Sequence, residues 1–287
     1  MEQPDFVSNY ISSLEFGGKS EGTIRAYNKD IAKLVSFFSI KNISDLDKLT
    51  VADYHNFYKS QSLKSESLNG LIRNLSAFFN YMVSTGEIED NAFFKVRFGT
   101  KKSVKINRVQ KDTLTPEEED LIIAAGLNLQ EKFMIAMALK TALRRGEIAS
   151  IKMSDISGCE ISIKSKGGDE TSHTYLDKEL CAMMQEYILK ERNTDSEYLF
   201  YAVRGNKGKN GISGTSINNR VRSACKRAGI TKNITSHRLR ATAITNVAFK
   251  HGDRAAQALA RHKSQATTNL YVNNNDAAVK NILLGDE

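Results

Sequence analysis

With 287 residues, the chain is too long for one ordinary domain and too short for three, so two domains are expected. Hydrophobic residues make up 40% and charged residues 26%, as in a soluble globular protein, and no stretch approaches the roughly 18 apolar residues of a membrane span. The amino terminus carries acids and no long apolar run, which excludes a signal peptide, and the net charge of +8 indicates an anionic partner.

The first 96 residues are predicted to form a domain of four helices. Apolar residues recur at helical spacing in 6–14, 20–39, 50–60 and 65–85, with polar breaks between them, and Ser20 or Thr23 can cap the second helix. The aromatic residues at this spacing are assigned to the core rather than to base stacking. The whole chain has only two prolines, which agrees with a mainly helical fold because proline interrupts helices.

Periodicity disappears and positive charge rises in residues 97–113, which are predicted to be a basic interdomain linker. Residues 101–113 contain five basic residues and one acid, so the linker is expected to lie along a phosphate backbone. The candidate DNA contacts in the linker are Lys101, Lys102, Lys105 and Arg108.

Residues 114–287 are predicted to form a second domain, helical apart from one β-hairpin. Thr115 and Pro116 open a helix in the cap and first positions, and a second helix follows at 130–143. Residues 160–166 alternate apolar and polar side chains, 167–169 have turn chemistry and 171–176 are extended, which predicts the hairpin. Further helices are expected at 177–191, 214–228, 236–250, 253–260, 265–272 and, after a turn, about 276–287.

Charge in the second half is sorted by segment. Residues 151–200 contain six basic and ten acidic residues, whereas residues 201–250 contain 11 basic residues and no acid. A solvated surface rarely sorts its charges in this way, so this half is expected to face a polyanion, with nucleic acid the leading candidate. Residues 205–211 lack the spacing of a nucleotide-binding loop and are assigned to a DNA-contacting loop. The candidate DNA contacts here are Lys207, Lys209 and Arg220.

The three cysteines, Cys159, Cys181 and Cys225, are an odd number without close spacing. This pattern supports neither a disulfide framework nor a cysteine-based zinc site. We therefore expect a reducing, cytoplasmic environment.

Two segments carry arginines suited to an anion. His237 and Arg240 fall on one face of the first turn of a helix capped by Thr235 or Ser236, where backbone N–H groups also favour negative charge. Arg144 directly follows core residues, so we expect it to be partly buried and to need an anionic partner, such as Glu147 three residues later. Each segment alone is equally consistent with an exposed helix start or an internal ion pair.

Two further segments complete the set. Lys166 closes the hairpin turn, where a lysine is usually a surface charge, and Tyr271 follows His262 by nine residues. In their order along the chain, the residues Arg144, Lys166, His237 with Arg240, His262 and Tyr271 resemble the tyrosine recombinase (phage integrase) family.

The resemblance covers essentially the whole chain and depends on four sequence boxes. The segment 141–148 (TALRRGEI) matches the family's Thr-Gly-Leu-Arg-x-x-Glu-Leu, and 237–240 (HRLR) matches its His-x-Leu-Arg. Segment 165–167 (SKG) matches the Gly-Lys-Gly hairpin, and 259–262 (LARH) matches Leu-Gly-His. Ala142 and Arg261 replace family glycines, which we expect to alter packing rather than chemistry. Ser165 replaces the first hairpin glycine, so Lys164 is kept as the alternative to Lys166.

The resemblance implies both the fold and the reaction. The fold would be a four-helix, SAM-like core-binding domain at 1–96 followed by a catalytic domain at 114–287. Tyr271 would attack the scissile phosphate and form a 3′-phosphotyrosyl link, with Arg144 and Arg240 stabilising the transition state. Lys166 would protonate the leaving 5′-oxygen. His237 and His262 would donate hydrogen bonds or assist proton transfer, and Glu147 would orient Arg144 or His237. No metal or cofactor is implied.

The resemblance also implies partners. The substrate would be duplex DNA with an inverted-repeat crossover site, clamped between the two domains. The protein would assemble there as a homotetramer by exchanging the tail at 276–287, with accessory DNA-bending proteins as further partners and a nucleoid-associated, cytoplasmic location. Because the core-binding helices begin at once, an Xer-like architecture is expected.

Two alternative functions stay open at this point. One is a DNA-binding regulator or excision accessory that has lost catalysis. The other is a topoisomerase that relaxes supercoils by the same chemistry. The sequence also leaves open whether a mobile element or a chromosome-dimer resolution system uses the protein.

Overall fold

The fold is described from a computed structural model, which covers residues 3–96, 113–164, 171–202 and 211–262. The chain divides into two units, Met1–Lys105 and Ile106–Glu287. Each unit has its own hydrophobic core, and each is described separately below.

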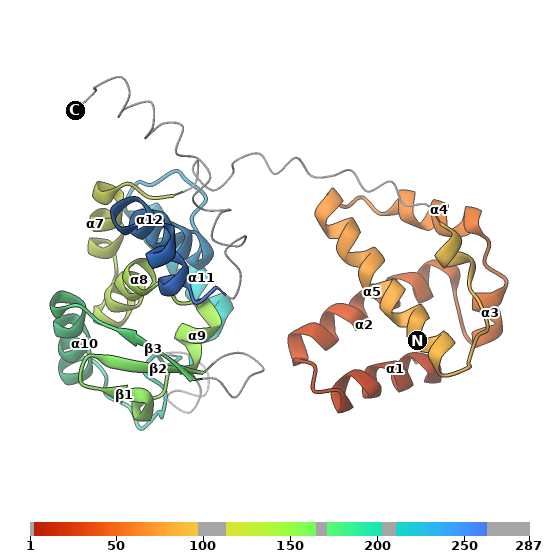
Figure 1. The fold of residues 1–287 in the computed structure, drawn as a ribbon, viewed down its shortest axis with the longest axis horizontal. Coiled ribbons are helices and arrows are strands. Elements are labelled where there is room, and N and C mark those ends of the chain that lie inside the picture. The colour runs from red at the N-terminus through yellow and green to blue at the C-terminus, as the bar shows by residue number, and fades with distance from the viewer. Residues whose placement is uncertain (1–2, 97–112, 165–170, 203–210, 263–287) are drawn as a thin grey trace, which may run out of the picture. The chain divides into compact units, whose positions relative to one another are not determined.

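The first unit is built from helices (Figure 1), which pack around a core rich in aromatic side chains. Its elements are α1 (Asp5–Phe16), α2 (Glu21–Phe38), α3 (Ile43–Asp47), α4 (Val51–Ser60), α5 (Ser65–Ser84) and the 3₁₀ helix η1 (Ala92–Lys95). α2 packs against both α1 and α5. Phe78 of α5 is fully buried and meets the ring of Tyr10 edge-on, with the ring centres 5.3 Å apart. The aromatic residues thus form the core, as their spacing predicted.

Local capping explains where these helices begin. The Ser20 hydroxyl accepts a hydrogen bond from the Thr23 backbone N–H, so Ser20 is the cap of α2. α4 begins with a reciprocal capping box between Thr50 and Asp53. The sequence prediction of four helices missed the short α3, whose five residues are too few for a visible apolar repeat, although Asn42 and Asp45 form a capping box there too.

The second unit surrounds one buried helix. Its helical elements are α7 (Pro116–Ala124), α8 (Leu129–Thr141), α9 (Arg145–Ser150), η2 (Met153–Asp155), α10 (Lys178–Lys190), α11 (Gly214–Arg227) and α12 (Ser236–Ala260). Ten of the 13 residues of α8 are buried, and α7, α10 and α12 pack against it. A helix that is apolar on all sides must be covered on all sides, so α8 is the centre of this unit.

A small antiparallel sheet completes the second unit. The strands β1 (Ile156–Ser157), β2 (Glu160–Lys164) and β3 (Thr171–Tyr175) lie in that order, with Ile161 opposite Thr174. Ile161 and Ile163 of β2 face the core, which produces the alternation seen in the sequence. The described residues thus form a mainly helical fold with a small β-sheet, as predicted. The two-residue strand β1 was not predicted.

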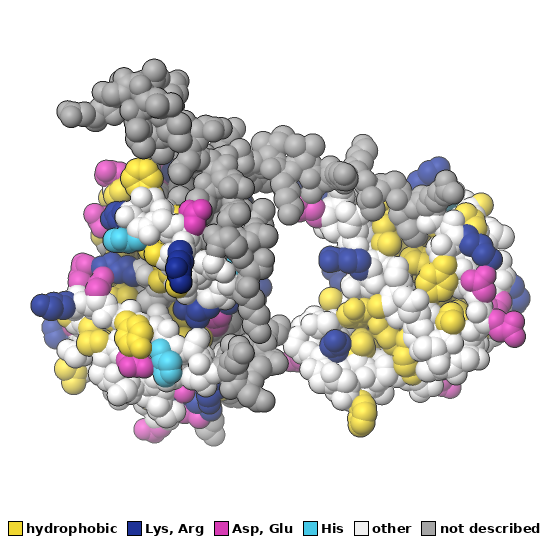
Figure 2. Space-filling model, viewed as in Figure 1, with side chains coloured by type: hydrophobic (Ala, Val, Ile, Leu, Met, Phe, Trp, Pro, Cys, Tyr) yellow, Lys and Arg dark blue, Asp and Glu magenta, His cyan; other side chains and the backbone are white. Residues whose placement is uncertain are grey.

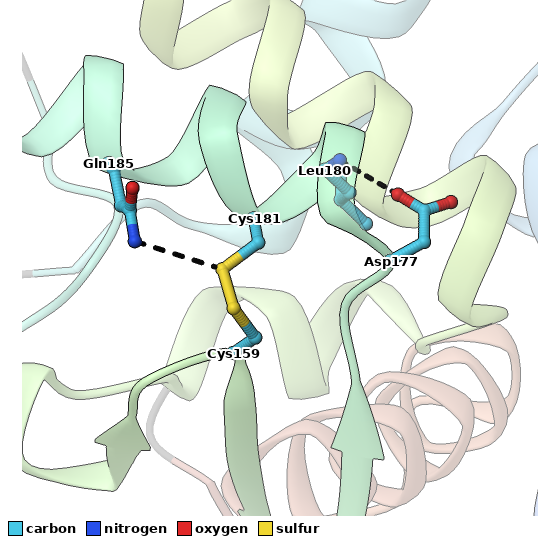
Figure 3. The surroundings of a disulfide bond; sticks show 5 residues. All are labelled: Cys159, Asp177, Leu180, Cys181 and Gln185. Carbon is cyan, nitrogen blue, oxygen red and sulfur yellow. Dashed lines mark hydrogen bonds between the residues drawn. A yellow bond between two sulfur atoms is a disulfide. The ribbon is translucent and has the colours of Figure 1, made fainter.

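Two cysteines form a bond that the sequence analysis did not expect. Cys159 follows β1 and Cys181 lies on α10, and their sulfurs form a disulfide with the Cα atoms 5.5 Å apart (Figure 3). The chain returns through β3 into α10, whose first turn is capped by Asp177, and this return brings together residues 22 positions apart. The expectation that the cysteines are unpaired is therefore wrong for this pair, while Cys225 is free and buried.

The outer surfaces of both units include hydrophobic side chains among the polar ones (Figure 2). The most exposed large ones are Phe16, Leu189, Phe249, Leu127 and Tyr175. Among the described residues, no helix combines the length and the low polarity that crossing a bilayer would require.

Candidate active site

The candidate site is assembled where two helices of the second unit end. α8 ends at Ala142 and α12 ends at Arg261, and both residues have left-handed backbone torsions with φ of 51°. Glycine adopts this conformation without strain, whereas a residue with a side chain loses roughly 1–2 kcal/mol. These are the two positions where the family pattern has glycine. Ala142 and Arg261 therefore keep the left-handed turn at each helix end, but the backbone there is more strained than it would be with glycine.

Arg240 joins the two helix ends from below the surface. Its side chain is 2% exposed, and its guanidinium donates hydrogen bonds to the carbonyl oxygens of Ala142 and, at 2.6 Å, Ala260. It also lies 3.1 Å from Nε2 of His262. Carbonyl oxygens at helix C-termini carry partial negative charge, so they stabilise a buried cation there. Arg240 therefore fixes the turns that precede Arg144 and His262.

Arg144 and Glu147 form the outer part of the site. Arg144 is the N-cap of α9, its backbone N–H donates to Oε2 of Glu147 at 2.7 Å, and its Nη1 lies 2.8 Å from Oε1. The expected partner is present, but the expectation of a partly buried arginine is wrong, since the side chain is 51% exposed. The chain leaves the core at the buried Leu143, so the next side chain is directed to the surface.

Glu147 is in contact with a second arginine. Nη2 of Arg261 lies 3.1 Å from Oε2 of Glu147, and the two side chains are 16% and 12% exposed. Burial raises the pKa of the Glu147 carboxyl, but the hydrogen bonds from Arg144 and the charge of Arg261 act in the opposite direction and hold this pKa below its usual value. Glu147 is thus an ionised carboxylate shared by two guanidiniums.

The two histidines are held in the neutral form. Burial, together with the charges of Arg240 and Arg144, lowers the pKa of His262 from 6.5 to about 4. Loss of water around the ring and the charge of Arg240 also lower the pKa of His237, whose outer face stays exposed. Since a guanidinium has no acceptor, Arg240 donates to Nε2 of His262, which assigns the ring proton of His262 to Nδ1.

The first turn of α12 is capped differently from the sequence prediction. Thr235 occupies the cap position but makes no side-chain cap hydrogen bond. Instead, Oδ1 of Asn218 on α11 accepts from the Ser236 backbone N–H at 3.1 Å and from the Ser236 hydroxyl at 2.6 Å. A residue 18 positions earlier thereby sets the start of the helix that carries His237 and Arg240, and no local pattern could have identified it.

Lys164 lies beside this group. It is the exposed last residue of β2, opposite Thr171. A hollow of about 170 Å³ between β2, α9 and η2 is lined by both Lys164 and Glu147, so the base of the hairpin is close to the Arg144–Glu147 pair. Arg220 lies on α11, partly buried, within electrostatic reach of Tyr187. The predicted residues that lie outside the described residues are Lys101, Lys102, Lys105, Arg108, Lys166, Lys207, Lys209, Tyr271 and the tail at 276–287.

The structure therefore groups four of the predicted residues and adds one. Arg144, Glu147, Arg240 and His262 are linked by direct contacts or through the carbonyl of Ala142, and His237 lies within their electrostatic reach. Sequence analysis treated Arg261 only as a change in packing. The signal that could have identified it is an arginine at a family glycine position directly before His262.

Comparisons with known proteins identify the family of both units. The profile of the phage integrase family matches residues 112–278, and that of the phage integrase N-terminal SAM-like domain matches residues 7–86. Tyrosine recombinase XerD of Listeria monocytogenes serotype 4b (strain F2365) is 24% identical over 92% of this chain and 92% of its own. Tyrosine recombinase XerA of Pyrococcus horikoshii is 26% identical over 93% of this chain and 88% of its own.

Solved structures share the fold. A lambda integrase dimer bound to a COC′ core site has a TM-score of 0.73 at 18% identity, covering 93% of this chain and 76% of that one. The XerH recombinase bound to palindromic difH substrate, in a post-cleavage complex, has a TM-score of 0.73 at 18% identity, covering 95% of this chain and 84% of that one. A lambda integrase tetramer bound to a Holliday junction has a TM-score of 0.71 at 19% identity, covering 91% and 77%.

Proposed function

This chain belongs to the phage integrase family, and from that membership we propose that it cuts and rejoins duplex DNA at a specific site through a covalent phosphotyrosine. Its relatives are tyrosine site-specific recombinases, and one of them, XerD of Listeria monocytogenes, matches over 92% of this chain. The chain is therefore a tyrosine site-specific recombinase. The observation that supports the proposed site most strongly is the convergence of Arg144, Arg240 and His262 at the ends of α8 and α12.

The proposed reaction conserves the energy of the phosphodiester bond. The phenol oxygen of Tyr271 attacks the scissile phosphorus, a 3′-phosphotyrosyl bond forms, and the bond between phosphorus and the 5′-oxygen breaks. The phenol loses its proton, and Lys166 gives one to the departing 5′-oxygen, with Lys164 as the alternative donor. The 5′-hydroxyl of another strand then attacks the phosphotyrosine, reverses these steps and restores the tyrosine.

Two guanidiniums are proposed to stabilise the transition state. Negative charge grows on the non-bridging phosphate oxygens, and planar arginine forks match it geometrically. The 51% exposure of Arg144 supports direct contact with the phosphate from solvent, while Arg240 is proposed to add its positive charge from the buried side, where it also joins the two helix ends. Glu147 orients Arg144 by binding both its backbone N–H and its guanidinium.

The neutral histidines are suited to proton transfer. With a pKa near 4, His262 is uncharged at neutral pH, and its Nδ1–H can donate to the phosphate or to the oxygen of the tyrosine. An approaching phosphate adds negative charge, which raises the pKa of this ring toward the working pH. Because Nε2 of His262 is engaged by Arg240, His262 is proposed to act as a hydrogen-bond donor through Nδ1–H, and His237 to assist the transfer of the proton from Tyr271.

DNA binding is proposed to extend beyond the catalytic centre. The named structural relatives are bound to DNA, and the basic linker residues Lys101, Lys102, Lys105 and Arg108 suit a phosphate backbone. Lys207, Lys209 and Arg220 belong to the basic stretch at 201–250. From the proposed DNA substrate, and not from the cysteines, two of which are paired, we propose that the protein acts in the cytoplasm on an inverted-repeat site in the nucleoid, with DNA-bending proteins as accessory partners.

Assembly is proposed to regulate the reaction. One solved relative is a tetramer on a Holliday junction, and the tail at 276–287 has apolar residues suited to docking on a neighbouring subunit. Deleting residues 276–287 is expected to spare DNA binding in a gel-shift assay but to reduce strand exchange about tenfold or more, because a 1.4 kcal/mol weaker assembly already changes an equilibrium tenfold. Undiminished strand exchange by the truncated protein would contradict the tail exchange.

The test of the function is covalent capture on DNA. A duplex selected by this protein from a random-sequence pool is nicked at successive positions, so that the freed fragment diffuses away and the adduct accumulates. We expect an adduct that resists denaturation and is lost in Tyr271→Phe but kept in the control Tyr175→Phe, whose side chain is 71% exposed on β3. Binding without an adduct would favour the silent regulator, and relaxation of supercoils without strand exchange would favour the topoisomerase.

A further inference from the structure

The residue before His262 is an arginine in a conformation that favours glycine. Arg261 has φ 51° and ψ 46° and ends α12, whose last carbonyl, that of Ala260, is bound by Arg240. A side chain at such a position strains the backbone, and strain of this kind persists only where the surroundings hold it in place. Unlike Ala142, which has the same φ and no polar side chain, Arg261 makes an interaction that a glycine would lack.

That interaction is with the carboxylate that holds Arg144. Nη2 of Arg261 lies 3.1 Å from Oε2 of Glu147, the same oxygen that accepts from the Arg144 backbone N–H at 2.7 Å. The other oxygen, Oε1, lies 2.8 Å from Nη1 of Arg144. Both oxygens of Glu147 are thus engaged, by Arg144 on the solvent side and by Arg261 on the buried side. The carboxylate therefore cannot rotate without breaking a charged hydrogen bond.

The net charge of this cluster matches the charge of the phosphate in the transition state of strand cleavage. Arg144 and Arg261 bring two positive charges against the single negative charge of Glu147, and Arg240 adds a third at the nearby ends of α8 and α12, so the site has an excess of two. A phosphodiester carries one negative charge and gains a second in a five-coordinate transition state. Burial lowers the pKa of Arg261, and its Nε is buried without a hydrogen-bond partner in the described part of the chain. The cluster is therefore more cationic than its own carboxylate can neutralise.

We propose that Arg261 is a positioning residue for strand cleavage, which acts through Glu147 to hold the guanidinium of Arg144 in its phosphate-binding geometry. This inference rests on the function proposed above. The Arg261 side chain compensates for the strain of the left-handed turn by fixing Arg144 through Glu147. A glycine at this position would relieve the strain but would leave the orientation of Arg144 less fixed. Arg261→Gly should therefore lower activity without lowering stability.

The test measures the single-turnover rate of adduct formation on the nicked duplex at saturating protein. We expect Arg261→Gly to reduce this rate about tenfold or more, with an unchanged dissociation constant for DNA and a melting temperature that is unchanged or higher. Arg261→Lys keeps the positive charge but not the planar guanidinium, so it is expected to react faster than Arg261→Gly and more slowly than the unmodified protein. The matched control is Arg254→Ala, an exposed arginine of the same helix, which is expected to react like the unmodified protein.

A double variant tests whether Arg261 acts through Glu147. If it does, Arg261→Gly combined with Glu147→Gln reacts no more slowly than the slower single variant, whereas multiplied losses would overturn the proposal. An unchanged rate in Arg261→Gly, or a reduced rate accompanied by a lower melting temperature and weaker DNA binding, would also overturn it. If the unmodified protein forms no adduct, the function proposed above fails instead, so the two failures are distinguishable.

Discussion

The two units differ in what they bury. Among the described residues, the first unit has one buried polar side chain, Asn91, in a core of aromatic and aliphatic groups. The buried polar side chains of the second unit are Gln130, Glu131, Thr141, Thr174, Ser196, Ser236, Arg240 and Thr242. Burying polar groups costs free energy unless each is hydrogen-bonded.

The buried polar groups of the second unit, which cost free energy to bury, include several that surround the candidate site. Thr141 belongs to the last turn of α8, and Ser236 and Arg240 belong to the first turns of α12, from which the Arg240 side chain reaches the carboxyl ends of α8 and α12 that frame the candidate site. In the part of the chain that the structure describes, the first unit buries almost only apolar groups and has one left-handed residue other than glycine, Ser39, whereas the second unit buries several polar groups and has two such residues, Ala142 and Arg261, beside the candidate site. Changes in the aromatic core of the first unit should therefore alter stability but not the rate at saturating protein, and changes at those helix ends should alter both.

The largest effect is expected for Arg240→Ala. It leaves two carbonyl groups and His262 without a buried cation, which is expected to cost about 3 kcal/mol of unfolding free energy and at least a hundredfold in cleavage rate. The matched change in the first unit is Phe79→Leu, which is expected to cost about 1–2 kcal/mol and to leave the rate unchanged at saturating protein. Chemical denaturation and single-turnover cleavage measure both. A comparable rate loss in Phe79→Leu would remove the distinction between the units.

The next largest effect is expected on stability when the disulfide is reduced. Reduction of the Cys159–Cys181 bond is expected to cost about 3 kcal/mol, because the unfolded chain gains the freedom of a loop of roughly 23 residues. Hydrogen exchange should then increase in β1, β2 and α10 and stay unchanged in the first unit. In the control Cys159→Ser with Cys181→Ser, reductant should have no effect. A reductant-dependent change in the control, or none in the native chain, would contradict the bond.

A slightly smaller effect is expected for Arg144→Lys. A lysine cannot present the planar fork to phosphate, so cleavage is expected to slow about a hundredfold, equivalent to about 2.7 kcal/mol. The side chain is 51% exposed, so unfolding free energy should change by no more than about 0.5 kcal/mol. The neighbouring exposed Arg145→Lys is the control and should keep its rate. Equal rate losses in both variants would indicate a general charge effect.

The smallest effect concerns pH. The unfolded chain protonates His262 near pH 6.5, but the folded protein does so only near pH 4, so the second unit loses unfolding free energy as the pH falls through this window. Because the ring is partly exposed, we expect about 1–2 kcal/mol. His262→Gln should flatten the dependence in denaturation curves at pH 7, 5.5 and 4.5, whereas the exposed His251→Gln should not. An unchanged slope in His262→Gln would exclude this source of acid sensitivity.

Local sequence patterns were sufficient for the longer elements. The apolar repeat predicted α1, α2, α5, α10 and α11 to within about two residues at their ends, and the alternation in 160–166 predicted β2. Thr115 and Pro116 occupy the cap and first positions of α7, as expected. These features depend on neighbours in the chain, which a sequence displays directly.

Features that depend on distant residues were missed. The disulfide requires the return of the chain through β3, and the cap of α12 comes from Asn218 on another helix. The exposure of Arg144 follows from the direction in which α8 ends, and the contact between Arg261 and Glu147 joins residues 114 positions apart. Their order along the chain nominated Arg144, Glu147, Arg240 and His262, which the structure brings together, but the contacts that link them could not be predicted because packing creates them.

The identity of the residue that becomes attached to DNA is the most direct test of the central claim. The adduct formed on the nicked duplex is digested with trypsin and a nuclease, and the modified peptide is sequenced by mass spectrometry. The proposed function predicts a nucleotide remnant on Tyr271, the single tyrosine of the tryptic peptide spanning residues 264–280. A remnant on any other residue, or an adduct that persists in Tyr271→Phe, would contradict it.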